Sequence, residues 1–455
     1  MSYLSLSTLC AVRHPQFLVL MLASLMGLSS HLRGAVATIP DESNNSKTIW
    51  EQSFLLGNCG GLRDLLSTKG IDFSAQYAAE VMGNPYGGNF GQGAVYSGLL
   101  SPALNINFDK LTHDAWKGAT FRASGFWIHG NSLTQKYVGD FSVVSNIDAY
   151  DTVRLDELWL QQNFLNDQVS LKIGQLTADS EFFMTTNGTL FINSTFGAFP
   201  LIGQNLRPYS PPIYPVATPG VRLHLQPIPE FYFQAAAFTG DSGSQQLNNH
   251  GTLFNFDPKA GALMFYEIGF LLNQGKNDQE LPGTYKVGGW VDTGDFTTWQ
   301  SQAEAALAAG SLRSAGIMYG IYGVVDQTVC KYNISPTQST TINLFLRAGT
   351  APPNATQVDF DIDGGVNISG LIPGRKNDLW GLGLARTAIS HDYSVSSEAQ
   401  GGPTFGYEAV LETTYSATIS QWWTVQPDVQ YIFAAGATTK SPDALVLGVR
   451  TTISF

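Results

Sequence analysis

The chain has 455 residues, of which 12% are aromatic and only 13% charged, and its formal net charge at pH 7 is −12. This acidic balance, without clustered Lys and Arg, argues against nucleic acid as a partner, because phosphate binding needs such clusters. Abundant glycine and aromatic residues with few charges are unusual for a soluble protein of this size. They are typical of an outer-membrane barrel, in which apolar and polar positions alternate and no single segment stands out as hydrophobic.

The first 37 residues predict export. Arg13 and His14 precede the apolar run Phe17–Leu28, and the small residues Ala35–Ala37 offer a cleavage site, as in a secretory signal peptide. A transmembrane anchor would need about 20 apolar residues, which this run does not reach. Residues 1–37 are therefore predicted to be a signal peptide, with cleavage after Ala37 favoured over a site nearer Ser30.

A short segment is expected between the signal peptide and the first strand. Leu62, Leu65 and Leu66 have helical spacing, which predicts a short helix on the periplasmic side. Residues 38–72 are assigned to this N-terminal segment and residues 73–455 to a transmembrane β-barrel.

Alternation with a period of two dominates the rest of the chain. In residues 219–227, Val221, Leu223 and Leu225 face one way, while Arg222 and the other intervening residues face the other way. Similar alternation recurs in residues 169–176, 231–238, 284–294, 316–327, 341–349, 408–417 and 423–433. The chain is therefore predicted to be all-β and antiparallel.

Two stretches break the alternation. Residues 298–313 have the composition of a helix, which we expect in a long loop on the extracellular side. Residues 207–219 are rich in proline and cannot pair as a central strand. They are predicted to form a loop that folds into the lumen.

The last stretch, Leu445–Phe455, alternates again up to the final residue. Leu445, Leu447 and Val449 share one face, and the residues between them are mostly small or polar. A tilted strand of about ten residues can cross a bilayer. The C-terminal residues are therefore predicted to form a transmembrane strand with one lipid-facing side.

No catalytic or metal motif emerges from the sequence. The Gly-Asp-Ser-Gly sequence at residues 240–243 is better explained as a turn than as a protease nucleophile loop. His and Cys residues show no zinc-binding spacing, so neither a metal nor a cofactor is expected. After signal-peptide removal, Cys59 and Cys330 remain, and they could form one disulfide.

Charged and aromatic residues on the presumed water-facing side of strands admit two interpretations. They are either solvated residues on a β-sandwich or the lining of a pore in which Trp127, Trp159 and Trp290 offer flat faces to sugars. The set of charged residues comprises Arg122, Arg154, Asp156, Glu157, Lys172, Arg222, Lys286, Arg347 and Glu412.

Three classes of function remain open from the residues: a passive porin, an outer-membrane enzyme such as a lipase, and a secreted soluble carbohydrate-binding β-protein. No outward-facing Ser and His pair stands out for the enzyme. Asp156 and Glu157 would point to opposite faces of a strand unless a bulge intervenes, so they make a poor acid and base pair.

Nine sequence stretches resemble the carbohydrate-selective porin family of the bacterial outer membrane. They include "GGLRDLLSTKGI" at residue 60, "VRLDELWLQQNF" at residue 153, "YPVATPGVRLHLQP" at residue 214 and "GLIPGRKNDLWGLG" at residue 370. The resemblance extends from Gly57 to Phe455 in the usual order of the family. Departures are Cys59 and Asp156, which stand where the family usually has aromatic residues.

The resemblance implies a sixteen-stranded, monomeric barrel that passes glucose and related sugars inward by diffusion, without catalysis. It implies that Arg154, Glu157 and Arg222 line the constriction, and strand alternation adds Arg122 and Trp159. It also implies that the C-terminal strand with Phe455 is the signal recognised by the barrel-assembly machinery.

Overall fold

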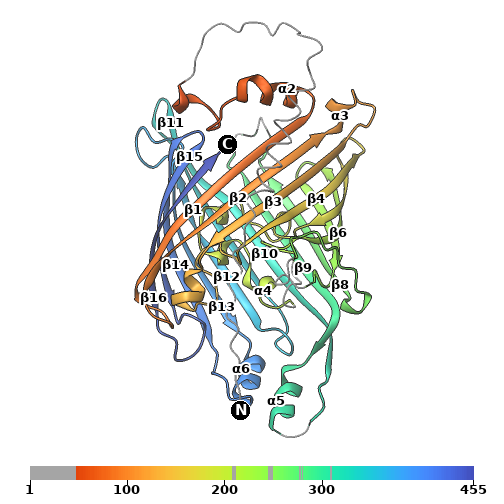
Figure 1. Ribbon diagram of the computed structural model, residues 1–455, viewed down its shortest axis with the longest axis vertical. Coiled ribbons are helices and arrows are strands. Elements are labelled where there is room, and N and C mark those ends of the chain that lie inside the picture. The colour runs from red at the N-terminus through yellow and green to blue at the C-terminus, as the bar shows by residue number, and fades with distance from the viewer. Residues whose placement is uncertain (1–47, 207–211, 244–248, 276–277, 279, 308–309) are drawn as a thin grey trace, which may run out of the picture. The chain divides into compact units, whose positions relative to one another are not determined.

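The computed structural model describes residues 48–455 except residues 207–211, 244–248, 276–277, 279 and 308–309 (Figure 1). The predicted signal peptide therefore lies outside the described residues. Sixteen strands of the described chain form one closed sheet, in which each strand is hydrogen-bonded antiparallel to its sequence neighbours and β1 pairs with β16. The predicted sixteen-stranded antiparallel barrel is confirmed.

The strands are β1 (Ile71–Gly87), β2 (Gly93–Asn107), β3 (Ala119–Gly130), β4 (Thr152–Phe164), β5 (Val169–Leu176), β6 (Thr218–Ile228), β7 (Phe231–Thr239), β8 (Ala262–Leu272), β9 (Gly283–Thr297), β10 (Ser314–Ser335), β11 (Gln338–Thr350), β12 (Val358–Ser369), β13 (Leu379–Ile389), β14 (Tyr407–Ser420), β15 (Trp423–Phe433) and β16 (Ala444–Ser454). The helical elements are η2 (Ile49–Glu51), η3 (Cys59–Gly61), α2 (Leu62–Thr68), α3 (Phe108–Leu111), η4 (Thr134–Val138), η5 (Gly188–Leu190), η6 (Ser194–Phe196), α4 (Pro200–Gly203), η7 (Pro258–Ala260), α5 (Trp299–Leu307) and α6 (His391–Ala399).

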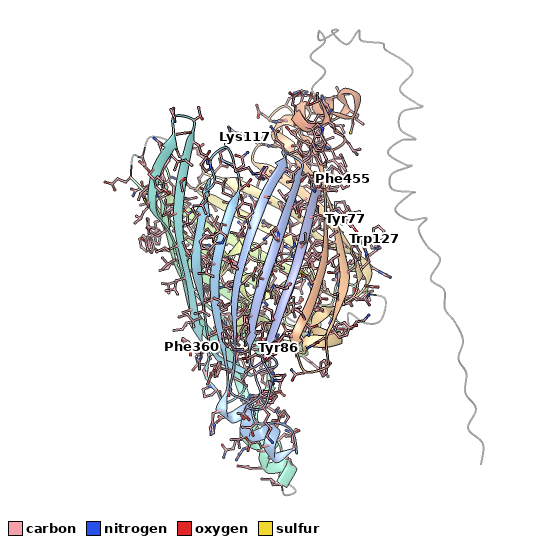
Figure 2. The ribbon with its side chains drawn as sticks, turned by 90° about the vertical axis from the view of Figure 1, so that its left-hand side faces the viewer. Tyr77, Tyr86, Lys117, Trp127, Phe360 and Phe455 are labelled. Carbon is pink, nitrogen blue, oxygen red and sulfur yellow. The ribbon has the colours of Figure 1, made fainter. Side chains whose placement is uncertain are left out.

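The two ends of the barrel differ in their connections. At one end, here called the turn end, connections are as short as residues 229–230 and 336–337, and α2 and Phe455 lie there (Figures 1 and 2). At the other, the loop end, α5 and α6 lie in long connections. The helices expected near Leu62 and within residues 298–313 are thus confirmed as α2 and α5. β1 begins at Ile71, whereas the sequence placed the first barrel residue at 73.

The strands alternate between a lipid-facing outer side and a buried inner side. In β16, Leu447 and Val449 are each 45% exposed, whereas Ala444 and Val446 are fully buried. Because the barrel is closed, β1 pairs with β16, and no sheet edge presents unpaired backbone N–H and C=O groups to the bilayer. Separately, no helix of the described residues is long and apolar enough to cross a membrane.

The connection between β5 and β6 is long, and its described residues, 177–206 and 212–217, fold into the barrel and are here called the inner loop. Its side chains Phe183 and Phe196 are buried against the inward-facing residues Phe265, Tyr322 and Phe345. Apolar packing of this kind excludes water from that part of the lumen. The inner loop therefore fills one side of the barrel interior.

The lumen loop predicted at residues 207–219 covers only the last part of this connection. Residues 207–211 lie outside the described chain, and residues 212–217 are in the loop, but Thr218 and Pro219 already belong to β6. Pro219 pairs with Gln175 of β5, while the pairing of β6 with β7 begins only at Gly220. Proline is tolerated there because that side of the strand end has no sheet partner to which it must donate.

Candidate functional site

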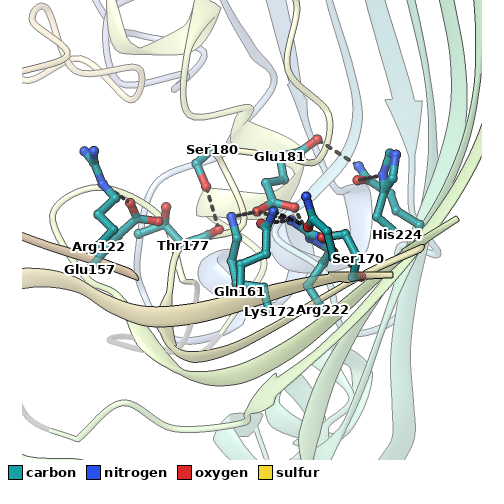
Figure 3. Close-up of polar contacts among 12 residues, drawn as sticks. Arg122, Glu157, Gln161, Ser170, Lys172, Thr177, Ser180, Glu181, Arg222 and His224 are labelled. Atoms are coloured by element: carbon teal, nitrogen blue, oxygen red, sulfur yellow. Dashed lines mark hydrogen bonds and ion pairs between the residues drawn. The ribbon is translucent and has the colours of Figure 1, made fainter. Parts of the chain in front are cut away.

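Charged side chains gather on the inner face of β3 to β6, opposite the first turn of the inner loop (Figure 3). Bulky outward residues such as Ile173, which is 57% exposed, fix the alternation and direct Lys172 and its even-numbered neighbours inward. We call these strand side chains, together with the neighbouring Trp159 and the facing Glu181 of the inner loop, the charged strip. It comprises Arg122, Glu157, Trp159, Lys172, Glu181 and Arg222.

One end of the charged strip is an ion pair between neighbouring strands. The Arg122 Nε donates to the Glu157 Oε2 at 3.0 Å, and its Nη1 donates to the Asn105 Oδ1 at 3.0 Å. The Arg122 side chain remains 31% exposed. Its guanidinium is therefore oriented by two partners and still reaches the lumen.

The other end is a carboxylate between two cations. Glu181 of the inner loop forms ion pairs with both Lys172 and Arg222. Arg222 also donates to the Ser170 Oγ at 2.8 Å and to the Gln161 Oε1 at 3.0 Å. Burial acts to raise the pKa of Glu181, but Lys172 and Arg222 together outweigh it and hold that pKa below its ordinary value. Glu181 is therefore a carboxylate at neutral pH.

Trp159 lies between the two ion-paired groups along β4. The Lys172 Nζ stands 4.3 Å from the centre of the Trp159 ring. This cation–π contact orients the indole and places a positive charge on one of its faces. Trp159 therefore belongs to the strip as a partly exposed aromatic wall.

A bulge in β4, the exception that the sequence left open, decides how Asp156 and Glu157 are oriented. The β3–β4 register slips between Ala123 and Gly125, so Ser124 lies opposite two residues of β4. The Ser124 Oγ donates to the Asp156 Oδ2 at 2.9 Å and accepts from the Glu157 N–H at 3.1 Å. An extra residue in one strand turns both carboxylates to the same side.

Arg154 has a different environment from the other predicted site residues. It is 3% exposed, and its guanidinium donates to the hydroxyl of Tyr150 in the connection before β4. The structure brings Arg122, Glu157, Trp159 and Arg222 onto one strip, whereas Arg154 links the strand wall to a loop. Its burial leaves little surface for a passing solute.

Two of the three tryptophans expected to offer flat faces to sugars are placed elsewhere. Trp127 is 41% exposed and lies on the outer face beside His129. Trp290 is 1% exposed and packed in the apolar cluster beneath the inner loop. Only Trp159 remains available on the inner wall.

Three of the charged residues expected to line the pore instead hold the inner loop. Arg347 is fully buried, pairs with Asp363 at 2.8 Å and donates to three inner-loop carbonyls. Glu412 accepts the N–H groups of Ile192 and Asn193, and the Lys286 Nζ donates to the Met184 carbonyl. Arg347 and Glu412 are fully buried and Lys286 is partly buried, because the inner loop covers this part of the wall. Strand alternation alone cannot reveal such a cover.

An open hollow adjoins the charged strip. It has a volume of about 420 Å³ and is lined by Gln161, Asn163, Asp167, Ser170, Glu181, Arg222, His224, Tyr232 and Gln234. The lining offers hydrogen-bond donors and acceptors almost throughout. The phenylalanines of the inner loop pack on β8, β10 and β11, and of the inner loop only Glu181 is among the lining residues, so the hollow leaves room for water and small solutes.

Sequence reasoning missed Glu181, because it lies on the inner loop and not on a strand. A signal was present: residues 181–202 contain five phenylalanines without strand alternation. An apolar connection of that kind must be buried somewhere in the fold.

A second carboxylate of the inner loop lies two residues before Glu181. Asp179 accepts the Tyr214 N–H at 2.8 Å, and burial raises the pKa of Asp179 to about 6.

The described part of the chain contains neither a metal-binding cluster nor a disulfide. No group of three His, Cys, Asp or Glu side chains there is arranged to hold a metal ion. Cys59 is exposed and Cys330 partly exposed, and both are free thiols. The disulfide left open by the sequence is therefore not formed.

The chain matches one family model over residues 91–455, that of the carbohydrate-selective porin, OprB family. Porin B of Pseudomonas aeruginosa is 24% identical over 93% of this chain and 94% of its own length. A putative porin, QuiX, of Acinetobacter baylyi is 22% identical over 92% of this chain and 98% of its own length.

A solved structure shares the fold. The high-pH structure of Pseudomonas putida OprB superposes with a TM-score of 0.80 at 23% identity, and it covers 90% of this chain and 100% of that chain. The likeness extends over the whole barrel.

Proposed function

The chain belongs to the carbohydrate-selective porin, OprB, family, and from this membership we propose that it lets glucose and related monosaccharides diffuse passively across the outer membrane. The closed barrel and the family make it a channel of the outer membrane. We propose that the turn end faces the periplasm, that the channel works as a monomer and that residues 1–37 are removed on export.

The observation that carries the sugar proposal is the charged strip beside the polar hollow. The Arg122 side chain is 31% exposed and Trp159 is partly exposed, while the buried Glu157 orients the Arg122 guanidinium fork. Such groups can replace the hydrogen bonds that a sugar makes with water, and the aromatic ring can stack on a pyranose. Because each charged group is already paired, the attraction is shallow, which conduction requires.

The proposed lining is Arg122 and Trp159, which are partly exposed, and Arg222 and Glu181, which line the polar hollow, with the buried Glu157 and Lys172 holding their partners in place. We propose that Arg154 contributes indirectly, by fixing the loop that holds Tyr150. Asp156 accepts a hydrogen bond from Ser124, and Glu157 forms an ion pair with Arg122. Because both carboxylates already have partners, a hydrolytic role for this pair is disfavoured.

The test is conductance of the purified protein in a planar bilayer with glucose titrated into the salt. The proposal predicts discrete open channels whose current falls as glucose is added, because the sugar occupies the passage. Matched titration with glycerol, which is too small to fill the hollow, controls for viscosity. Channels that glucose does not affect would overturn the sugar proposal, and a folded barrel without channels would overturn the porin proposal.

Phe455 is proposed as the signal read by the barrel-assembly machinery. Its backbone N–H donates to the Ala75 carbonyl at 2.9 Å, at the seam where β16 meets β1. Phe455→Asp is expected to lower the amount of heat-modifiable barrel in the outer membrane several-fold, with Phe455→Tyr as the control that keeps an aromatic ring. Normal amounts of assembled Phe455→Asp protein would contradict the proposed role.

A further inference from the structure

A stretch before the first strand, residues 48–68, runs along the rim of the turn end and is here called the rim segment (Figure 1). It is tied to the barrel by its backbone: the Leu55 N–H donates to the Ser454 carbonyl at 2.9 Å, and the Trp422 indole donates to the Ile49 carbonyl at 2.8 Å. The rim segment therefore has a fixed position relative to β15 and β16.

Its aromatic contact continues the lipid-facing surface. Trp50 stacks on Trp422 with ring centres 5.9 Å apart, and it lies 6.4 Å from Trp423. The Trp423 indole donates to the Thr451 Oγ1 at 2.8 Å, and Thr451 shares the outer face of β16 with the exposed Val449. The ring of Trp50 is thus placed directly beyond the edge of the outer apolar band.

The rim segment exposes several large apolar side chains. Trp50 is 58% exposed, Leu56 is 60% exposed and Leu65 is 55% exposed, and Ile49 and Leu62 are similar. In α2, Leu62 and Leu65 are three residues apart and share one side, while Asp64 lies on the opposite side. About half of this apolar face is left uncovered by the described chain.

We propose that the rim segment lies in the head-group region of the membrane leaflet at the turn end, with Trp50, Leu62 and Leu65 inserted among phospholipids. The occupant is a lipid surface because the exposed residues are continuous with the outer face of the barrel. Tryptophan favours the membrane interface, and a short apolar helix face can lie in its plane. The inference goes beyond sugar conduction and requires only that the barrel spans a bilayer.

The anchor for this arrangement is Arg63. Its Nη1 donates to the Phe73 carbonyl at 2.9 Å, and its guanidinium lies 3.9 Å from the centre of the Phe54 ring. Arg63 thereby holds α2 to the start of β1, on the side of the helix that does not carry Leu65. The apolar face is left free to point away from the rim.

The test uses spin labels on the full chain expressed, exported and recovered from outer membranes, with the other cysteines replaced by Ser. Leu65→Cys and the matched control Asp64→Cys are labelled with a nitroxide and reconstituted in vesicles of phosphatidylethanolamine and phosphatidylglycerol. The Leu65→Cys label is expected to collide several-fold more often with oxygen than with a water-soluble nickel chelate, and the Asp64→Cys label the reverse. Equal nickel accessibility at both positions would place the segment in water and overturn the proposal.

A second measurement needs no label. Brominated phospholipids quench tryptophan on contact, so the wild-type protein should lose more fluorescence in them than Trp50→Phe does. Equal losses would show that Trp50 is not in lipid and would overturn the proposal.

The spin-label experiment has one further outcome. Protection of the Leu65→Cys label from both oxygen and nickel would indicate that protein covers this position, and it would also overturn the proposal.

Discussion

Replacing Arg222 by alanine is expected to weaken the block of channel current by glucose about tenfold or more. Hydrogen bonds to charged groups contribute about 1.5–3 kcal/mol, and about 1.4 kcal/mol corresponds to a factor of ten in affinity. Arg222→Ala removes the guanidinium that pairs with Glu181 and bonds to Gln161 and Ser170. The titration of single-channel current with glucose measures the change directly.

The same variant should also shift ion selectivity towards cations, because Glu181 then has only Lys172 as a partner. Arg222→Lys is the control: it keeps the charge but loses the planar fork, so selectivity should stay near that of the wild type while glucose block weakens. An Arg222→Ala channel with wild-type glucose block would remove Arg222 from the proposed lining.

The barrel itself could be predicted from the sequence, because strand alternation reports which face of each strand is apolar. The residues of β16 show this: the alternation from Leu445 to Ile453 matches the outer face of the structure. The family resemblance supplied the number of strands. Pattern and resemblance agree here because a membrane leaves the backbone few other solutions.

The interior could be predicted only in part. Arg122, Glu157, Trp159 and Arg222 come together because neighbouring strands place their inward residues side by side. Period-two reasoning cannot locate Glu181, because no pairing register relates a loop to a strand. Nor can it locate the bulge in β4 that turns Asp156 and Glu157 to the same side, which the sequence admitted only as an exception.

Replacing Asp326 by alanine is expected to loosen the inner loop and lower the free energy of unfolding by roughly 2–4 kcal/mol. One fully buried donor left unsatisfied costs about 1–3 kcal/mol, and the other three donors, which are only partly buried, cost less. The Asp326 carboxylate on β10 accepts four hydrogen bonds from Thr185, Thr186 and Asn187, at 2.6 to 3.1 Å. Urea unfolding in detergent measures the loss, and Asp72→Ala, at an exposed position of β1, is the control.

The functional consequence of Asp326→Ala follows from the position of Glu181, four residues before Thr185 on the same loop. A loop that moves carries Glu181 away from Lys172 and Arg222, so the open-channel current should become noisier and glucose block weaker. Asp326→Asn keeps one acceptor oxygen and should fall between the wild type and Asp326→Ala. Quiet current and unchanged stability in Asp326→Ala would mean that the apolar packing of the phenylalanines alone fixes the inner loop, and the carboxylates on the strands would then be dispensable for the shape of the passage.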